Sequence, residues 1–134
     1  MQRPLDRMSL SAGLNCVQAR ESARRTLAEH DVPAALVDDV LTVVSELASN
    51  AMRHAGGITD FRVTVQADQV TIEVSDHSPL PPRLQPPSPH TPGGFGWRVV
   101  KTLAPTVFVR FHRGGKTIVA SLPAPHRPPS RPMT

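Results

Sequence analysis

The chain has a single cysteine, no tyrosine and only 4% aromatic residues in 134 positions. Cys16 has no second cysteine to pair with, which excludes an internal disulfide. No run of about 18 apolar residues is present, so no segment is long enough to span a bilayer as a helix. The N-terminus also lacks the order of basic, apolar and small residues that marks a signal peptide. We therefore expect a single soluble domain in the cytoplasm, with no membrane partner.

The lack of aromatic residues also weighs against a nucleic-acid partner. The net charge is +4 and the isoelectric point is about 10.6, and clustered basic residues bind phosphates by releasing counterions. Here, however, the arginines are scattered from Arg3 to Arg131, and no basic stripe is interleaved with aromatic residues for base stacking. Nucleic-acid binding is disfavoured and is kept as an alternative.

Several familiar catalytic motifs are absent. The histidines show no metal-ligand spacing, which disfavours a zinc site, and no Gly-x-Ser-x-Gly elbow is present for nucleophilic hydrolysis. The glycine-rich residues 93–97 do not follow a strand and lack the third glycine of a dinucleotide fingerprint. Residues 115–117 (GKT) are not a P-loop, because the position of its first glycine is Arg110.

Prolines divide the chain unevenly. Seven of the 15 lie in residues 79–92 and five in residues 123–132, and neither stretch can form a regular helix or a central strand. Residues 79–92 lie between ordered segments, so we expect a long loop that acts as a lid. Residues 123–134 are predicted to be a disordered tail rich in proline and arginine, and residues 1–14 a flexible N-terminus. The domain itself then covers residues 15–122.

Hydrophobic periodicity predicts the elements between these segments. Helices are expected at about residues 17–30 and 34–54, the second with one apolar stripe that Gly56 and Gly57 terminate. Alternating apolar and polar residues predict two antiparallel hairpins, and a short helix lies between them. Their expected ranges are 61–66 and 70–75 for the first hairpin, 96–103 for the helix, and 106–111 and 116–121 for the second hairpin. This order predicts an α+β fold, a two-layer α/β sandwich with a mixed or antiparallel sheet covered on one face by helices.

The second predicted helix carries polar residues beside its apolar stripe. Glu46 and Asn50 are four residues apart and share one helix face, with Arg53 and His54 one turn further on. One interpretation is an ordinary solvent-facing strip at the end of an amphipathic helix. Asn, however, is a poor helix former in the interior of a helix, and its carbonyl oxygen suits Mg²⁺.

Two further polar sites follow along the chain. Asp76 ends a predicted strand before Ser78 and Pro79, where Asp commonly caps a turn by accepting backbone N–H groups. Alternatively, its carboxylate accepts hydrogen bonds from an exocyclic amine such as that of adenine. The glycines in residues 93–97 open the third helix, where free N–H groups and the helix dipole attract phosphate.

Together and in this order, the motifs at residues 46–55 (ELASNAMRHA), 74–79 (VSDHSP), 94–96 (GFG) and 115–117 (GKT) resemble the GHKL ATPases. Histidine kinase catalytic domains, gyrase-type ATPases and anti-sigma factor serine kinases share this Bergerat ATP-binding fold. The chain is most similar to the small, stand-alone anti-sigma factor/serine-protein kinase group of actinobacterial type, over roughly residues 16–122.

The resemblance implies a role for each matching residue. Asn50 would coordinate Mg²⁺ on the ATP phosphates, and Glu46 would be the catalytic base or orienting group near the γ-phosphate. Asp76 would read the adenine amine, with Thr117 supporting that contact directly or through water. The remaining implied nucleotide-binding residues are Arg53, His54, Ser78, Gly94, Phe95, Gly96 and Trp97.

The function implied by the resemblance is that of an ATP- and Mg²⁺-binding regulator of transcription. It would be a serine/threonine-protein kinase that phosphorylates an anti-anti-sigma-type partner and also sequesters a sigma factor as an anti-sigma factor. The alternative is a non-enzymatic switch, in which ATP only orders the lid and the protein acts by binding its partner. A homodimer is left open.

Overall fold

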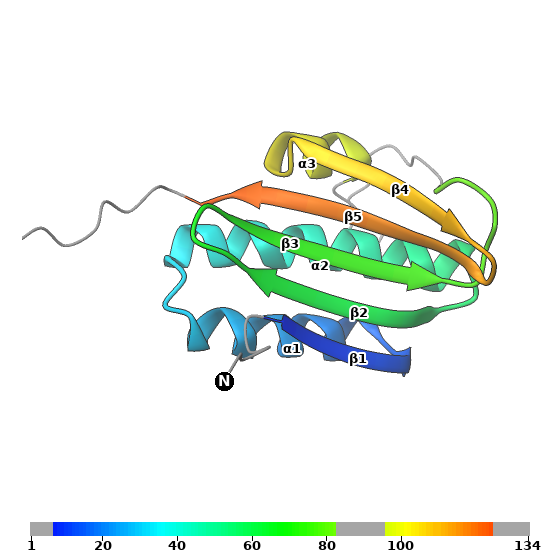
Figure 1. Ribbon diagram of the computed structural model, residues 1–134, viewed down its shortest axis with the longest axis horizontal. Coiled ribbons are helices and arrows are strands. Elements are labelled where there is room, and N and C mark those ends of the chain that lie inside the picture. Colours follow the sequence, from blue (N-terminus) through cyan, green and yellow to red (C-terminus); the bar gives the residue numbers. More distant parts are fainter. Residues whose placement is uncertain (1–6, 83–95, 125–134) are drawn as a thin grey trace, which may run out of the picture.

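The computed structural model describes residues 7–82 and 96–124, and the side chains from residue 14 onward within these ranges. Figure 1 shows how the helices and strands follow one another along the chain. Their bounds are β1 (Arg7–Leu14), α1 (Cys16–Glu29), α2 (Ala34–His54), β2 (Ile58–Val65), β3 (Gln69–Asp76), α3 (Gly96–Leu103), β4 (Thr106–His112) and β5 (Gly115–Pro123).

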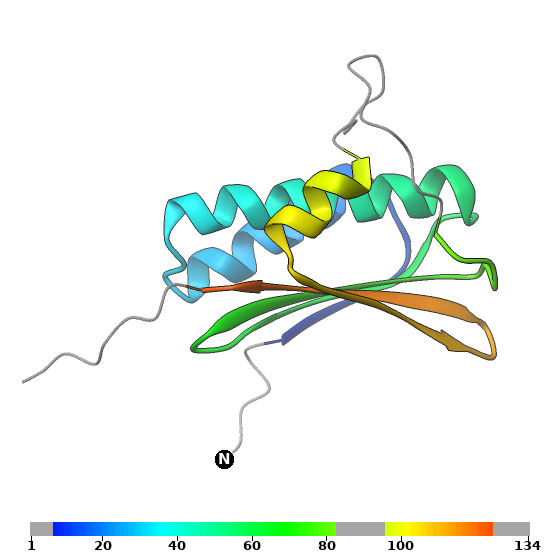
Figure 2. The same cartoon turned by 90° about the horizontal axis from the view of Figure 1, so that it is seen from above.

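The strands of the described residues form one five-stranded sheet in the order β1-β2-β3-β5-β4. Every pairing is antiparallel, which resolves the expectation of a mixed or antiparallel sheet. Figure 2 shows α1, α2 and α3 together on one face of this sheet. The predicted α+β sandwich, with its sheet covered on one face, is therefore confirmed.

The N-terminal segment differs from the prediction. Residues Arg7–Leu14, expected within a flexible N-terminus, form β1 at one edge of the sheet. The strand pairs with β2 from Arg7 opposite Thr64 to Leu14 opposite Ile58, with a register shift after Ser11. Its sequence, RMSLSAGL, places an apolar residue at every second position, a pattern that is compatible with a strand.

The core lies between α2 and the central strands. The stripe of α2 that the periodicity predicts faces the sheet, and Val40, Val44 and Leu47 are fully buried there. Alternate residues of the strands supply the opposite wall of the same core, namely Phe61, Val63, Val70, Ile72, Val74, Ile118, Ala120 and Leu122. The last turns of α2, the end of β3 and the start of β5 lie at one end of this core, where the polar residues gather.

Part of the predicted loops lies outside the described residues. Of the predicted lid at residues 79–92, the structure describes residues 79–82 only, and residues 125–134 of the predicted tail are outside it. β5 continues to Pro123, one residue into the segment that was assigned to the tail.

Candidate functional site

Two residues of the polar strip of α2, Glu46 and Asn50, point inward. Glu46 and Asn50 are each only 2% exposed, although both carry polar side chains near the end of the helix. A solvent-facing strip would be exposed, so burial decides against that interpretation. Arg53, two turns beyond Glu46, places its Nη2 atom 4.0 Å from Glu46 Oε2 and remains 30% exposed at its side chain. A buried carboxylate and carboxamide thus lie beside a cation that still reaches solvent.

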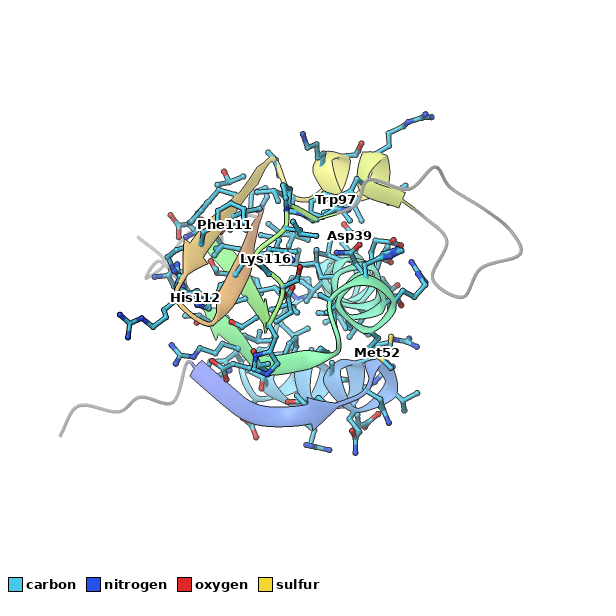
Figure 3. All side chains as sticks on the ribbon, turned by 90° about the vertical axis from the view of Figure 1, so that its right-hand side faces the viewer. Asp39, Met52, Trp97, Phe111, His112 and Lys116 are labelled. Carbon is cyan, nitrogen blue, oxygen red and sulfur yellow. The ribbon has the colours of Figure 1, made fainter. Side chains whose placement is uncertain are left out.

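A pocket of about 250 Å³ opens beside these residues. Three elements line it: the end of α2, the segment after β3, and the start of β5. Figure 3 looks at this end of the molecule and places Lys116 between the β4–β5 hairpin and α2. The lining residues are Asn50, Arg53, His54, Ala55, Ser78, Leu80, Pro81, Pro82 and Lys116.

Asp76, the last residue of β3, does not line this pocket but contacts Lys116, which does. It is 1% exposed, and its Oδ1 accepts hydrogen bonds from the Ser78 backbone N–H at 2.8 Å and from Lys116 Nζ at 3.1 Å. The first of these bonds is the turn that a strand-ending Asp commonly makes. Its Oδ2, in contrast, is buried and has no hydrogen-bond partner in the part of the chain that the structure describes. A buried acceptor without a partner is costly, and such an atom marks a place for a ligand.

Lys116 was not predicted as a site residue, yet it joins the pocket to Asp76. Its side chain is 2% exposed, and its ammonium group contacts both Asp76 Oδ1 and, at 3.5 Å, the backbone carbonyl of Ser78. The sequence held a signal for it. Lys116 occupies the first position of the alternating series that buries Ile118, Ala120 and Leu122 on the helix-covered face.

Thr117, by contrast, is not brought to Asp76. In the antiparallel register, Asp76 pairs with Lys116 and Ser75 pairs with Thr117. Since successive strand residues point to opposite faces, Thr117 lies on the face away from the helices. Its hydroxyl shares hydrogen bonds with Ser75 Oγ at 2.7 Å and with His112 Nε2 at 3.1 Å. The direct contact with Asp76 is made by Lys116, and the support that Thr117 would give to the adenine contact, directly or through water, stays a prediction.

The predicted phosphate loop is described only at its end. Gly94 and Phe95 lie outside the described residues, and Gly96 begins α3, which packs against α2. Trp97 is 6% exposed, and its indole Nε1 is buried without a hydrogen-bond partner among residues 7–82 and 96–124. This second unpaired polar atom lies on the element that the sequence assigned to phosphate binding.

No group of three or more His, Cys, Asp or Glu side chains is placed to hold a metal ion within the described ranges. Asn50 is the predicted metal ligand and lines the pocket. A single protein oxygen of this kind suits Mg²⁺, which usually retains waters and takes further ligands from substrate phosphates. In the same ranges, no helix combines the length and apolar character that a membrane span requires.

Comparison with known proteins identifies the family. One solved structure, the RsbU and RsbW domains of Rv1364c from Mycobacterium tuberculosis, matches 90% of this chain with a TM-score of 0.63 and 17% identity. The chain spans about a third of that protein, since 33% of it is covered. A search of curated protein sequences found no match. The family model for the histidine kinase-like ATPase domain matches residues 11–122. This chain therefore belongs to the histidine kinase-like ATPase domain family.

Proposed function

We propose that this protein binds ATP with Mg²⁺ and, as a serine/threonine-protein kinase, transfers the γ-phosphoryl group to an anti-anti-sigma-type partner. The observation that carries the proposal is the buried, unpaired Oδ2 of Asp76 behind a pocket lined by Asn50, Arg53 and Lys116. Membership of the ATPase family supports nucleotide binding. The partner, and a role as anti-sigma factor, rest on the motif resemblance.

The described residues suit the parts of a nucleotide. Asp76 Oδ2 offers an acceptor to the amino group of the base. Arg53 and His54 line the pocket and bring donors to phosphate oxygens. Asn50 offers a carbonyl oxygen to Mg²⁺, which when bound neutralises charge on the phosphates.

Glu46 is the residue we assign to the transfer step. Its side chain is 3% exposed and lies one helical turn from Asn50, so it faces the same end of the site. There it would accept the proton of the incoming hydroxyl or orient that hydroxyl. Arg53, whose Nη2 lies 4.0 Å from Glu46 Oε2, balances the charge of this carboxylate. Catalysis of this kind is mainly positioning and electrostatic stabilisation.

Replacing Asn50 tests the nucleotide site. Asn50→Ala is expected to weaken ATP binding in the presence of Mg²⁺ by about tenfold or more, since it removes a ligand to a charged group. Isothermal titration calorimetry with and without EDTA measures this, and the difference between the proteins should shrink when EDTA is present. Met52→Ala, an exposed change on the same helix, is the control. Equal affinity of Asn50→Ala and the unaltered protein would refute the assignment.

Replacing Glu46 separates the kinase from the binding switch. Glu46→Gln is expected to retain ATP binding but to slow phosphoryl transfer by at least about 10²-fold, because an amide accepts no proton. Transfer from γ-labelled ATP to a co-purifying partner protein measures this, with the exposed Glu29→Gln as the matched control. Partner capture without any transfer by the unaltered protein would instead establish a non-enzymatic switch.

A further inference from the structure

The two oxygens of the Asp76 carboxylate are in unlike surroundings. Oδ1 accepts from Ser78 N–H and from Lys116 Nζ, at 2.8 and 3.1 Å. Oδ2 is equally buried and accepts from no group among the described residues. Among the described residues, therefore, one of the two oxygens has its donors and the other has none.

Lys116 contributes to this difference between the two oxygens, because it lines the pocket and donates to Oδ1 only. An ammonium group has three donors, and two of them are directed to Asp76 Oδ1 and to the Ser78 carbonyl. The residue also lines the pocket, whereas Asp76 does not. A ligand that reaches Asp76 Oδ2 thus meets the Lys116 ammonium beside it, with one N–H left to donate.

The purine bases differ in what they present to such a pair. Adenine offers a donor, its 6-amino group, next to an acceptor, N1. Guanine offers two adjacent donors, N1–H and the 2-amino group, which match a carboxylate only if both of its oxygens are free. With Oδ1 held by Lys116, one guanine donor would lack an acceptor and would face an ammonium group. Leaving a donor unpaired in a buried site is an effective means of discrimination.

We propose that Lys116 determines the base specificity of the site: by holding Oδ1 of Asp76, it leaves a single acceptor that fits 6-aminopurine nucleotides and rejects guanine nucleotides. This inference rests on the proposed binding of a nucleotide base at Asp76. It assigns to Lys116 a role in selecting the base, in addition to pairing with a buried carboxylate.

Titration with ADP and GDP tests the proposal. The unaltered protein should bind ADP more tightly than GDP. In Lys116→Met the ratio of the two affinities should fall by about tenfold, because Oδ1 then keeps only its bond from Ser78 N–H and can accept a second donor. Lys101→Met is the matched control, since Lys101 is the only other lysine and is exposed on α3. Its ratio should equal that of the unaltered protein.

A second variant and a second measurement guard against misfolding. Lys116→Met leaves a buried carboxylate without its cation, so circular dichroism must first show that it folds. Lys116→Gln keeps a neutral donor for Oδ1 and should retain the preference for ADP. In the unaltered protein, ¹⁵N NMR of the two lysine side chains should show a slowly exchanging Lys116 ammonium that persists when ADP is added.

The outcomes distinguish the inference from the function on which it rests. If the unaltered protein binds neither ADP nor GDP, the nucleotide site is wrong and the inference is rejected with it. If ADP binds but folded Lys116→Met keeps the ratio of the unaltered protein, only the specificity role is overturned. Loss of the slowly exchanging Lys116 signal on addition of ADP would also overturn it, because Lys116 would then have left Asp76.

Discussion

Gly115→Ala is expected to lower the free energy of unfolding by about 3 kcal/mol or more, and the melting temperature by more than about 10 °C. Gly115 has a φ of 146°, a region that residues with a side chain rarely adopt. A Cβ atom at this position would overlap the backbone carbonyl oxygen of Asp76 and lie 2.8 Å from His77 Cα. Both contacts are with backbone, which cannot rotate away as a side chain can. Chemical and thermal denaturation followed by circular dichroism measures the loss.

The neighbouring glycine is the matched control. At Gly114, a Cβ atom would meet nothing within 4 Å, and φ is not positive, so Gly114→Ala should be close to neutral. Equal losses for the two variants would contradict the steric explanation. The close approach at Gly115 also has a functional consequence, because it brings the start of β5 against Asp76 and so sets Lys116 beside that carboxylate.

The central elements of the fold were predictable because their patterns are long and regular. The apolar stripe of α2 predicted residues 34–54, and the structure places the helix at Ala34–His54. Both hairpins were found within three residues at each end by alternation. β1 was missed although its sequence, RMSLSAGL, places an apolar residue at every second position, and its pairing with β2 becomes evident only in three dimensions.

The candidate site was predictable in its residue types and less so in its contacts. The sequence alone could not decide whether Glu46 and Asn50 face solvent, because a polar strip has the same spacing on a helix whether it faces solvent or a binding site. Their burial follows from where α2 ends relative to the sheet. The contact between Asp76 and Lys116 was not predicted. Lys116 and Thr117 are neighbours in β5 and lie on opposite faces of the sheet, and only the register of β3 with β5 shows which of them reaches Asp76.

Removing both members of the buried ion pair should give a folded protein that does not bind ATP. Asp76→Leu alone leaves the Lys116 ammonium, 2% exposed, without its carboxylate, and should cost about 3–5 kcal/mol of stability. The double variant, Asp76→Leu with Lys116→Met, replaces both charges by apolar side chains of similar size. It should recover most of that loss, because well-packed apolar pairs can replace buried ion pairs. The unpaired Ser78 N–H should leave a residual cost of about 1 kcal/mol.

Urea denaturation of the two single variants and the double variant gives the coupling between Asp76 and Lys116, and calorimetry with ATP gives the binding. A matched cycle on Glu73 and Arg110, an ion pair at 3.2 Å with the arginine 54% exposed, should show a coupling below about 1 kcal/mol. Additive losses at Asp76 and Lys116 would contradict their pairing. ATP binding by the stable double variant would contradict Asp76 as the acceptor for the base. The double variant thereby separates stability from base recognition, because it restores stability but lacks Asp76 Oδ2, the oxygen that would accept from the base.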